Sequence, residues 1–328
     1  EKRRCGASRL RALLRREGCI MLPGCHDAMG AKLIQEAGFE CGYLSGFAVS
    51  ATRLAEPDIG LATYNDMLDT ARACCDCVSI PLIGDGDTGY GGILNVRRTV
   101  HGYARAGLAA ISIEDQSFPK RCSYASGVQF VAHDEALERI RAALKARDEI
   151  RDKEGIDILI IARSDSARAT PPPGGGRKEV ILETLKRCRA FQSAGADIVY
   201  AEGLETEEEM KALNAAITVP TMIAQVERPD VPLVSTSKAN ELGFKLSLRG
   251  VTVLNAQITA TKRVLQALRE ERVLHTGPPS LSARELMPFQ ELYETVGFPG
   301  AYAWERDFHT SQTQVALLEE TDREIESS

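Results

Sequence analysis

The chain has 328 residues, 44% of them hydrophobic, and a formal net charge of −6 at pH 7. This composition is typical of a globular protein in water, and the mild acidity argues against a nucleic-acid partner, which requires a basic face. No apolar stretch reaches the roughly 18 residues that span a membrane. The nine cysteines are an odd number spread over a long chain, which predicts reduced thiols. We expect a cytoplasmic protein, or one of an organelle matrix if a targeting peptide has been removed.

Eight short apolar runs alternate with amphipathic stretches through most of the chain. Near-continuous apolar strands with helices between them are typical of a parallel sheet that is covered on both faces. Eight such units favour a closed α/β barrel, the (β/α)₈ or TIM barrel, over an open sheet. The expected strands are residues 19–23, 41–46, 81–86, 109–114, 157–163, 197–202, 220–225 and 244–249. Glycines that suit left-handed helix ends precede several strands: Gly38, Gly107, Gly195 and Gly243.

Further segments lie outside the eight repeated units. Residues 7–17 are expected to form an extra N-terminal helix, and two more helices are expected at about 284–295 and 310–325. We interpret residues 1–280 as the barrel domain and 281–328 as a C-terminal helical arm. Apolar side chains of this arm need a surface to cover, on the same barrel or on a neighbouring one: Leu286, Phe289, Leu292, Tyr293 and Phe298.

Polar residues collect where the predicted strands end. Because active sites of this fold lie at the C-terminal ends of the strands, these residues are the first candidates for function. Charged residues at strand ends can also be solvated starts of loops, so a single one carries little weight. The set is Tyr43, Ser45, Gly46, Asp85, Asp87, Glu114, Asp115, Arg163, Asp165, Glu202, Gln225, Glu227 and Arg249.

Three carboxylates of this set end neighbouring strands. Asp85 and Asp87 are two residues apart, which places both side chains on one face of a strand, and Glu114 ends the next strand. Three nearby carboxylates repel one another unless a cation neutralises them. Oxygen ligands suit a hard ion such as Mg²⁺. The sequence therefore predicts a Mg²⁺ site, with Mn²⁺ as a possible substitute.

Groups that bind anions stand on other strand ends. The guanidinium of Arg163 presents a fork of donors that can hold a carboxylate with two hydrogen bonds. Backbone amides around Ser45, Gly46 and Phe47 are placed to bind a second carboxylate. Together with the metal, these groups predict a small dianionic ligand.

The loop at 114–127 carries a possible proton donor. Cys122 follows Lys120 and Arg121, and nearby cations lower the pKa of a thiol, so we expect Cys122 to exist partly as thiolate. A positioned thiol can act as a general acid or base. The alternative is an inert loop cysteine.

Several motifs resemble the isocitrate lyase/phosphoenolpyruvate mutase superfamily. The similarity covers roughly residues 7–300 and is closest to the branch of 2-methylisocitrate lyase, oxaloacetate acetylhydrolase, dimethylmalate lyase and the petal death protein. The run 45–50 followed by 57–60 looks particularly like the petal death protein. The combination is specific, although each piece alone is weak. The motifs are residues 22–28 (Leu-Pro-Gly-Cys-His-Asp-Ala), 43–46 (Tyr-Leu-Ser-Gly), 84–91 (Gly-Asp-Gly-Asp-Thr-Gly-Tyr-Gly), 113–116 (Ile-Glu-Asp-Gln), 119–122 (Pro-Lys-Arg-Cys) and 162–165 (Ala-Arg-Ser-Asp).

The resemblance implies roles for individual residues. Mg²⁺ would be held by Asp85, with Asp87, Glu114 and Asp58 acting mostly through water. Cys122 would protonate the departing carbanion from a mobile loop that also carries Lys120. The resemblance further implies a homodimer or homotetramer with a C-terminal helix swapped onto a neighbouring barrel. Substrate contacts would come from Tyr43, Ser45, Gly46, Arg163 and Glu202.

The chain departs from the family pattern at substrate-binding positions. The lyases usually follow the catalytic cysteine with Gly-His, where this chain has Ser123 and Tyr124. Their seventh strand usually offers Asn, where this chain has Gln225. We keep Ser123, Tyr124 and Gln225 as substrate-binding candidates, but the departures put the identity of the substrate in doubt.

The expected function is Mg²⁺-dependent cleavage of a carbon–carbon bond, with the general base left open between Tyr43 and a water organised by the metal. The substrate would be a small 2-hydroxy or 2-oxo di- or tricarboxylate of the methylisocitrate, isocitrate, oxaloacetate or alkylmalate type. One alternative is a phosphorus–carbon enzyme: phosphoenolpyruvate mutase, carboxyphosphonoenolpyruvate mutase or phosphonopyruvate hydrolase. Another is an inactive barrel that serves in binding.

Overall fold

Eight parallel strands form a closed barrel in the computed structural model, which describes residues 6–125, 127–227, 233–270 and 286–308. Every strand pairs with its neighbours in chain order, and β1 pairs with β8 to close the barrel. The predicted fold and all eight predicted strands are confirmed, with ends that shift by a few residues. The strands are β1 (Ile20–Cys25), β2 (Gly42–Leu44), β3 (Leu82–Asp85), β4 (Ala110–Glu114), β5 (Leu159–Ser164), β6 (Ile198–Ala201), β7 (Thr221–Ala224) and β8 (Leu246–Arg249).

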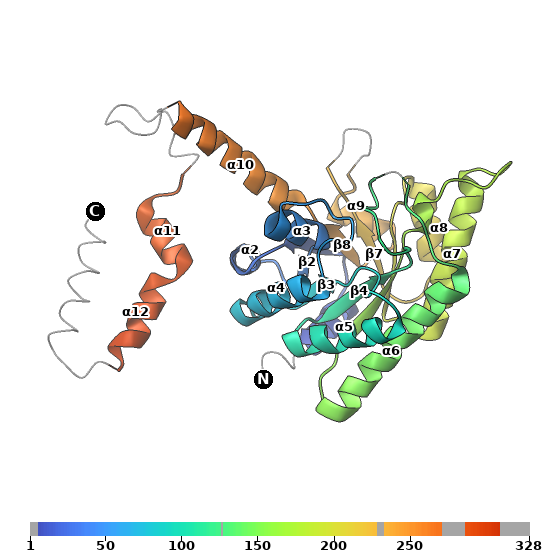
Figure 1. Ribbon diagram of the computed structural model, residues 1–328, viewed down its shortest axis with the longest axis horizontal. Helices are drawn as coiled ribbons and strands as arrows, with labels where there is room; N and C mark the ends of the chain where they lie inside the picture. Colours follow the sequence, from blue (N-terminus) through green and yellow to red (C-terminus); the bar gives the residue numbers. More distant parts are fainter. Residues whose placement is uncertain (1–5, 126, 228–232, 271–285, 309–328) are drawn as a thin grey trace. The chain divides into compact units, whose positions relative to one another are not determined.

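Helices follow the strands and cover the outside of the barrel (Figure 1). The expected glycine helix ends are confirmed, since Gly107 and Gly195 end their helices with φ of 102° and 106°, and only glycine adopts such angles without strain. The helices of the barrel are α2 (Ala28–Glu36), α3 (Gly46–Leu54), α4 (Tyr64–Cys77), α5 (Ile93–Ala106), α6 (His133–Glu154), α7 (Arg177–Ala194), α8 (Glu207–Ala216) and α9 (Thr236–Glu241), with a short 3₁₀ helix at Ser166–Arg168.

The core has layers inside and outside the strands. Inside, side chains such as Leu22, Ile83 and Ile161 are fully buried and fill the barrel. The predicted N-terminal helix is confirmed as α1 (Gly6–Arg15). Its buried Leu10 joins the inner cluster beside residues that precede β4, so α1 covers the N-terminal end of the barrel. At the opposite end, where the strands end, polar side chains gather.

The chain divides into two compact units, one up to Asn255 and one from Ala256 onward. The division falls within α10 (Thr252–Arg269), and the boundary expected at residue 280 lies outside the described residues. The second unit also contains α11 (Phe289–Val296) and α12 (Phe298–Arg306). The first expected C-terminal helix matches α11 in part, α12 was not expected, and the helix expected at 310–325 lies outside the described residues.

Aromatic rings hold the second unit together locally. Tyr293 stacks on Phe298 with ring centroids 4.6 Å apart, while Phe289 and Trp304 are 71% and 68% exposed. Among the described residues, we find no helix with the length and apolar character that crossing a membrane requires.

Candidate active site

A pocket of about 160 Å³ opens at the C-terminal ends of the strands. Most of the sequence-predicted site residues line it, whereas Gly46, Asp87 and Glu114 are not among the residues that line it. The predicted residues that line it are Tyr43, Ser45, Phe47, Asp58, Asp85, Lys120, Cys122, Ser123, Tyr124, Arg163, Glu202 and Gln225. Residues that the sequence analysis did not assign also line it: Arg121, Tyr200, Ala224, Val226, Leu248, Gly250 and Val251.

Four acidic side chains surround one edge of this pocket, and we call Asp58, Asp85, Asp87 and Glu114 the rim carboxylates. All four are at most 9% exposed. Asp87 has a φ of 47°, a left-handed conformation that is uncommon for a residue other than glycine and that clusters at functional sites. A side-chain atom at Gly86 would lie 2.7 Å from the backbone oxygen of Ser112, so glycine is needed for β3 and β4 to approach there.

Lys120 lies among the rim carboxylates. Its Nζ is 2.6 Å from Oδ1 of Asp58 and 2.6 Å from Oδ1 of Asp87. Burial by itself lowers the pKa of Lys120, but the carboxylates of Asp87 and Asp58 raise it well above its usual value, which keeps the ammonium charged. Burial raises the pKa of Asp87 to about 7, and the charge of Asp85 adds to the rise. One buried ammonium therefore faces more acidic groups than it can neutralise.

Glu114 is the rim carboxylate with the fewest partners. Neither of its carboxylate oxygens accepts a hydrogen bond from the described residues, although Oε2 lies 3.4 Å from Nη1 of Arg163. Burial raises its pKa well above the usual value despite the charge of Arg163. Buried acceptors without hydrogen bonds are costly. Such atoms are suited to a cation or a water held by one.

The rim carboxylates fit a hard cation by donor type, but they do not form a ready cage. Within the part of the chain that the structure describes, no three His, Cys, Asp or Glu side chains lie close enough to hold one ion together. The charges of Lys120 and Arg163 lie between them. Mg²⁺ usually keeps several waters and takes one or two protein carboxylates. The donor set therefore fits an ion that is held by few direct ligands and by water.

The first turn of α3 supplies backbone donors next to Asp85. Ser45 caps the helix, because its Oγ accepts a hydrogen bond from the amide of Ala48 at 3.3 Å. A side-chain atom at Gly46 would lie 3.0 Å from Oδ2 of Asp85, so glycine permits this close approach. The first amides of a helix have no partner within it and attract anions. The predicted anion-binding amides around Phe47 thus lie at a helix N-terminus.

Arg163 does not present its fork to the pocket as expected. Nε and Nη2 donate to Oδ1 and Oδ2 of Asp165 at 2.6 and 2.9 Å. Nη2 also donates to Oγ of Ser123 at 2.6 Å. Nη1 points to the rim, 3.4 Å from Glu114 and 4.0 Å from Asp85. Because the fork is already engaged, Arg163 offers a ligand the single nitrogen Nη1 rather than a bidentate grip.

The thiol of Cys122 is half-buried in the wall of the pocket. Burial raises its pKa, and this outweighs the opposing effect of Lys120 and Arg163. The expectation of a partial thiolate is therefore wrong, because burial of the thiol outweighs the effect of the nearby cations. A protonated thiol is the form that can donate a proton.

Tyr43 is fully buried at the end of β2. Burial, with a contribution from the charge of Asp85, raises the pKa of its phenol well above the usual value. Its hydroxyl makes no hydrogen bond of good geometry to the described residues. A neutral phenol donates hydrogen bonds but does not remove protons at neutral pH. Tyr43 is therefore unsuited to be the general base that the sequence left open.

The wall of the pocket opposite the rim carboxylates carries one further acidic side chain, Glu202, with aromatic partners. Glu202 accepts a hydrogen bond from the hydroxyl of Tyr200 and lies 3.8 Å from Nη2 of Arg168. The guanidinium of Arg168 covers the ring of Tyr124 at 5.1 Å. Burial and the charge of Glu202 raise the pKa of Tyr124 well above its usual value. This wall places neutral aromatic surface and a paired carboxylate opposite the rim.

Gln225 is fixed by the backbone that follows β7. Its Nε2 donates to the carbonyl of Val234 at 2.9 Å, and its Oε1 accepts from the amide of Val234 at 2.5 Å. Nε2 also donates to Oγ of Ser247 at 3.1 Å. Both ends of the amide are thus engaged, which gives Gln225 a structural role in the wall.

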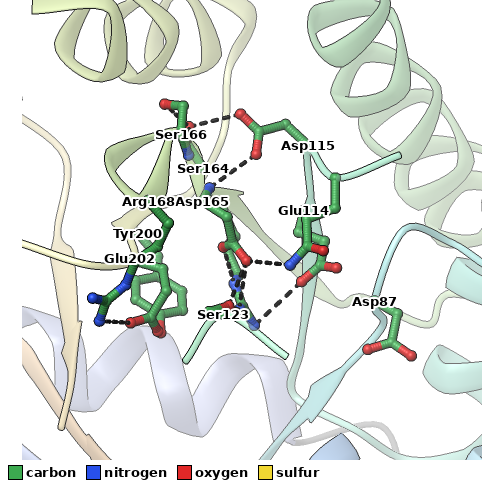
Figure 2. Close-up of polar contacts among 12 residues, drawn as sticks. Asp87, Glu114, Asp115, Ser123, Ser164, Asp165, Ser166, Arg168, Tyr200 and Glu202 are labelled. Carbon is green, nitrogen blue, oxygen red and sulfur yellow. Dashed lines mark hydrogen bonds and ion pairs between the residues drawn. The ribbon is translucent and has the colours of Figure 1, made fainter. Parts of the chain in front are cut away.

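A buried network behind the pocket received no role in the sequence analysis. Asp115 accepts hydrogen bonds from Ser164 Oγ, the Asp165 amide and Arg187 at 2.7, 2.9 and 3.1 Å. Figure 2 shows Asp115 facing Ser164 and Ser166, while the carboxylate of Asp165 points the other way, toward Ser123. The one available signal was that Asp115 and Asp165 follow the ends of neighbouring strands.

Comparisons with known proteins agree with this geometry. Residues 10–269 match the family model described as phosphoenolpyruvate phosphomutase. The 2,3-dimethylmalate lyase of Eubacterium barkeri is 38% identical over 74% of this chain and 78% of its own. The chloroplastic carboxyvinyl-carboxyphosphonate phosphorylmutase of Arabidopsis thaliana is 34% identical over 80% and 74%. A structure of oxaloacetate acetylhydrolase with 3,3-difluorooxalacetate has 33% identity and a TM-score of 0.79, covering 92% of this chain and 96% of its own.

Proposed function

We propose, from the premise that the chain belongs to the phosphoenolpyruvate mutase/isocitrate lyase superfamily, that it is a Mg²⁺-dependent carbon–carbon lyase. Members of this superfamily are carbon–carbon lyases and phosphonomutases that act on small carboxylates. The proposed substrate is a 2-hydroxy or 2-oxo di- or tricarboxylate. Its single strongest support is that Cys122, Asp85 and Arg163 line one pocket.

The proposed binding mode uses fixed donors on two sides of the pocket. The first amides of α3 and Nη1 of Arg163 would receive the carboxylates of the substrate. We expect Asp85 to hold Mg²⁺ directly, with Asp58, Asp87 and Glu114 contributing through water. When bound, Mg²⁺ would neutralise charge on the substrate's C1 carboxylate and 2-oxygen. The hydroxyl of Tyr43 is available to donate a hydrogen bond from inside the barrel.

Cys122 is the proposed general acid. When the carbon–carbon bond breaks, its electron pair stays on a carbon of the departing fragment. The Sγ–H bond of Cys122 would supply a proton to that carbon, and its raised pKa favours the protonated form that this step needs. Lys120, which lies on the same loop as Cys122, would stay paired with Asp58 and Asp87.

Replacement of the thiol tests this proposal. Cys122→Ser should lower turnover roughly 10²–10⁴-fold, which is the usual contribution of a general acid, while calorimetry still detects Mg²⁺ binding. Cys77→Ser is the matched control, because Cys77 is exposed and lies at the end of α4. Candidate substrates are 2-methylisocitrate, isocitrate, oxaloacetate and alkylated malates. Full activity of Cys122→Ser would remove Cys122 from the chemistry.

Phosphorus–carbon chemistry is the second candidate, and it is favoured by the similarity to the phosphorylmutase from Arabidopsis thaliana. The same pocket would then bind a phosphonate in place of a carboxylate. Parallel assays with phosphonopyruvate and with the carboxylic substrates separate the two. Turnover of phosphonopyruvate alone would favour the mutase or hydrolase.

We also propose that the protein is a homodimer or homotetramer. Phe289 and Trp304 of the second unit are more than two-thirds exposed, and exposed aromatic side chains often mark interfaces. Phe289→Ser with Trp304→Ser should shift the mass in analytical ultracentrifugation toward the monomer. Leu94→Ser is the control, because Leu94 is 78% exposed on α5 of the barrel. An unchanged mass would contradict the interface.

A further inference from the structure

One buried carboxylate connects two parts of the pocket. Asp165 is 0% exposed, and its side chain receives hydrogen bonds from Gln116, Ser123 and Arg163. Figure 2 shows its carboxylate pointing toward Ser123. The distances to Oδ2 are 2.6 Å from Gln116 Nε2, 2.6 Å from Ser123 Oγ and 2.9 Å from Arg163 Nη2. We call these four residues the Asp165 junction.

The junction holds the segment that carries Cys122 at both of its ends. Gln116 begins this segment and Ser123 follows Cys122 directly. Gln116 also uses its Oε1 to accept a hydrogen bond from the amide of Arg121 at 2.9 Å. Lys120 and Cys122 therefore lie on a stretch of chain that is attached to β5 through one carboxylate.

The junction also holds Arg163. The hydroxyl of Ser123 has one proton, which it donates to Asp165, and it accepts a hydrogen bond from Nη2 of Arg163 at 2.6 Å. Arg163 keeps its two bonds to Asp165 without Ser123. Neutralising the guanidinium thus requires Asp165 but not Ser123, so the serine has a separate role.

We propose that Ser123, acting through Asp165, is a positioning residue that sets the place of Cys122 relative to Arg163. The hydroxyl links the residue next to the proposed proton donor with the guanidinium that faces the rim. The catalytic part of this inference rests on the proposed function, whereas the attachment of the loop does not. A displacement of about 1 Å at a reacting group is enough to lower a rate strongly.

Ser123→Ala tests the role of the hydroxyl, with Ser123→Thr as the variant that retains it. In Ser123→Ala, we expect kcat to fall roughly tenfold or more, with KM within about threefold because Arg163 keeps its fork on Asp165. Ser123→Thr should restore most of the activity. Ser117→Ala is the matched control on the same loop, because the Ser117 hydroxyl makes no hydrogen bond to described residues.

A labelling experiment gives a readout that does not depend on activity. Iodoacetamide is added at one fixed pH, and the labelled peptides of Cys122 and of the exposed Cys77 are followed by mass spectrometry. Release of the loop in Ser123→Ala should speed labelling of Cys122 several-fold relative to Cys77, as expected for a locally opened segment. Gln116→Met, which removes another donor of the junction, should act in the same direction.

The outcomes separate this inference from the proposed function. If labelling and kcat in both Ser123→Ala and Gln116→Met match those of Ser117→Ala, the positioning role is wrong, even when Cys122→Ser is inactive. If Cys122→Ser keeps full activity, the general-acid proposal is wrong, and the labelling ratio still decides whether the junction holds the loop. Equal melting temperatures of the variants would show that the labelling change is local.

Discussion

Two groups of buried carboxylates lie at the same end of the barrel, and they differ in the hydrogen bonds that they receive. The four rim carboxylates surround the pocket edge, whereas Asp115 and Asp165, which we call the anchor carboxylates, lie behind it. Both oxygens of Glu114 lack hydrogen bonds from described residues. Asp115 and Asp165 each receive at least three.

This difference separates carboxylates that are suited to bind a ligand from carboxylates that stabilise the fold. Burial raises the pKa of Glu114 well above its usual value. Burial of Asp165 acts in the same direction, but Arg163 and the hydrogen bonds of the junction reverse it and lower its pKa. Burial also raises the pKa of Asp115, so hydrogen bonding rather than the pKa direction distinguishes the groups. A carboxylate with its hydrogen bonds made stabilises the fold, and one without them is available to a ligand.

The largest effect is expected at the rim. Asp85→Asn should lower kcat/KM roughly 10³-fold, a loss comparable to removing a charge-stabilising group from an active site, because the proposed direct ligand loses its charge. The free energy of unfolding should stay close to that of the wild type. Steady-state kinetics and urea denaturation measure the two effects, and calorimetric titration follows Mg²⁺ binding. Asp152→Asn, at a side chain that is 76% exposed, is the control, and normal Mg²⁺ binding by Asp85→Asn would refute the assignment.

The opposite pattern is expected behind the pocket. Asp115→Asn should lower the free energy of unfolding by about 3 kcal/mol, because it removes the buried acidic partner of Arg187 and leaves the guanidinium with Glu183, whose side chain is 42% exposed. Urea denaturation without Mg²⁺ measures this change. A loss below about 0.5 kcal/mol is the range of ordinary surface substitutions. It would show that the anchor carboxylates stabilise the fold no more than the rim carboxylates do.

The pH dependence of Mg²⁺ affinity sharpens the comparison. Carboxylates must be ionised to bind a metal, and the pKa of Asp87 is raised to about 7. Affinity should therefore fall as the pH drops below about 7, by up to roughly tenfold per pH unit for each proton taken up. Calorimetry between pH 6 and 8 tests this, with Asp87→Asn expected to flatten the slope. A constant affinity across this range would mean that the rim is already ionised.

The smallest effect concerns the stability cost of Glu114. The pKa of Glu114 is raised in the folded state. The stability that this group contributes is therefore highest at low pH, and it is lost as the pH rises from the pKa of the unfolded state toward the pKa of the folded state. Glu114→Gln should therefore gain roughly 0.5–1 kcal/mol over the wild type in alkaline buffer and less at pH 5. Thermal melts with a chelator measure the gain. If Glu114→Gln instead falls below the wild type in stability as the pH rises, Glu114 belongs with the anchor carboxylates.

Much of the fold could be predicted from local patterns. The eight apolar runs and the glycines that end helices determine the barrel, because strand burial and helix caps depend on short-range sequence. The positions of Asp85, Arg163 and Glu202 at strand ends followed from the same pattern. The charge state of Cys122 did not, since its neighbours Lys120 and Arg121 suggested a lowered pKa where burial raises it.

The partners of the charged residues depend on contacts between distant segments. Asp165 joins Gln116 and Ser123, which lie 49 and 42 residues earlier in the chain. Lys120 pairs with Asp58, which lies in the segment between α3 and α4. No local pattern specifies which of several acids a given cation meets, because that choice depends on the register of the strands and on the course of the loops between them.

The sequence alone therefore determined the barrel, the end at which polar groups gather and the kinds of chemistry available there. The tertiary structure decided which of those groups are already bound to one another and which remain open to a ligand. The physical reason is that burial makes a carboxylate costly unless hydrogen bonds or a counter-charge compensate for it, and those partners come from remote parts of the chain.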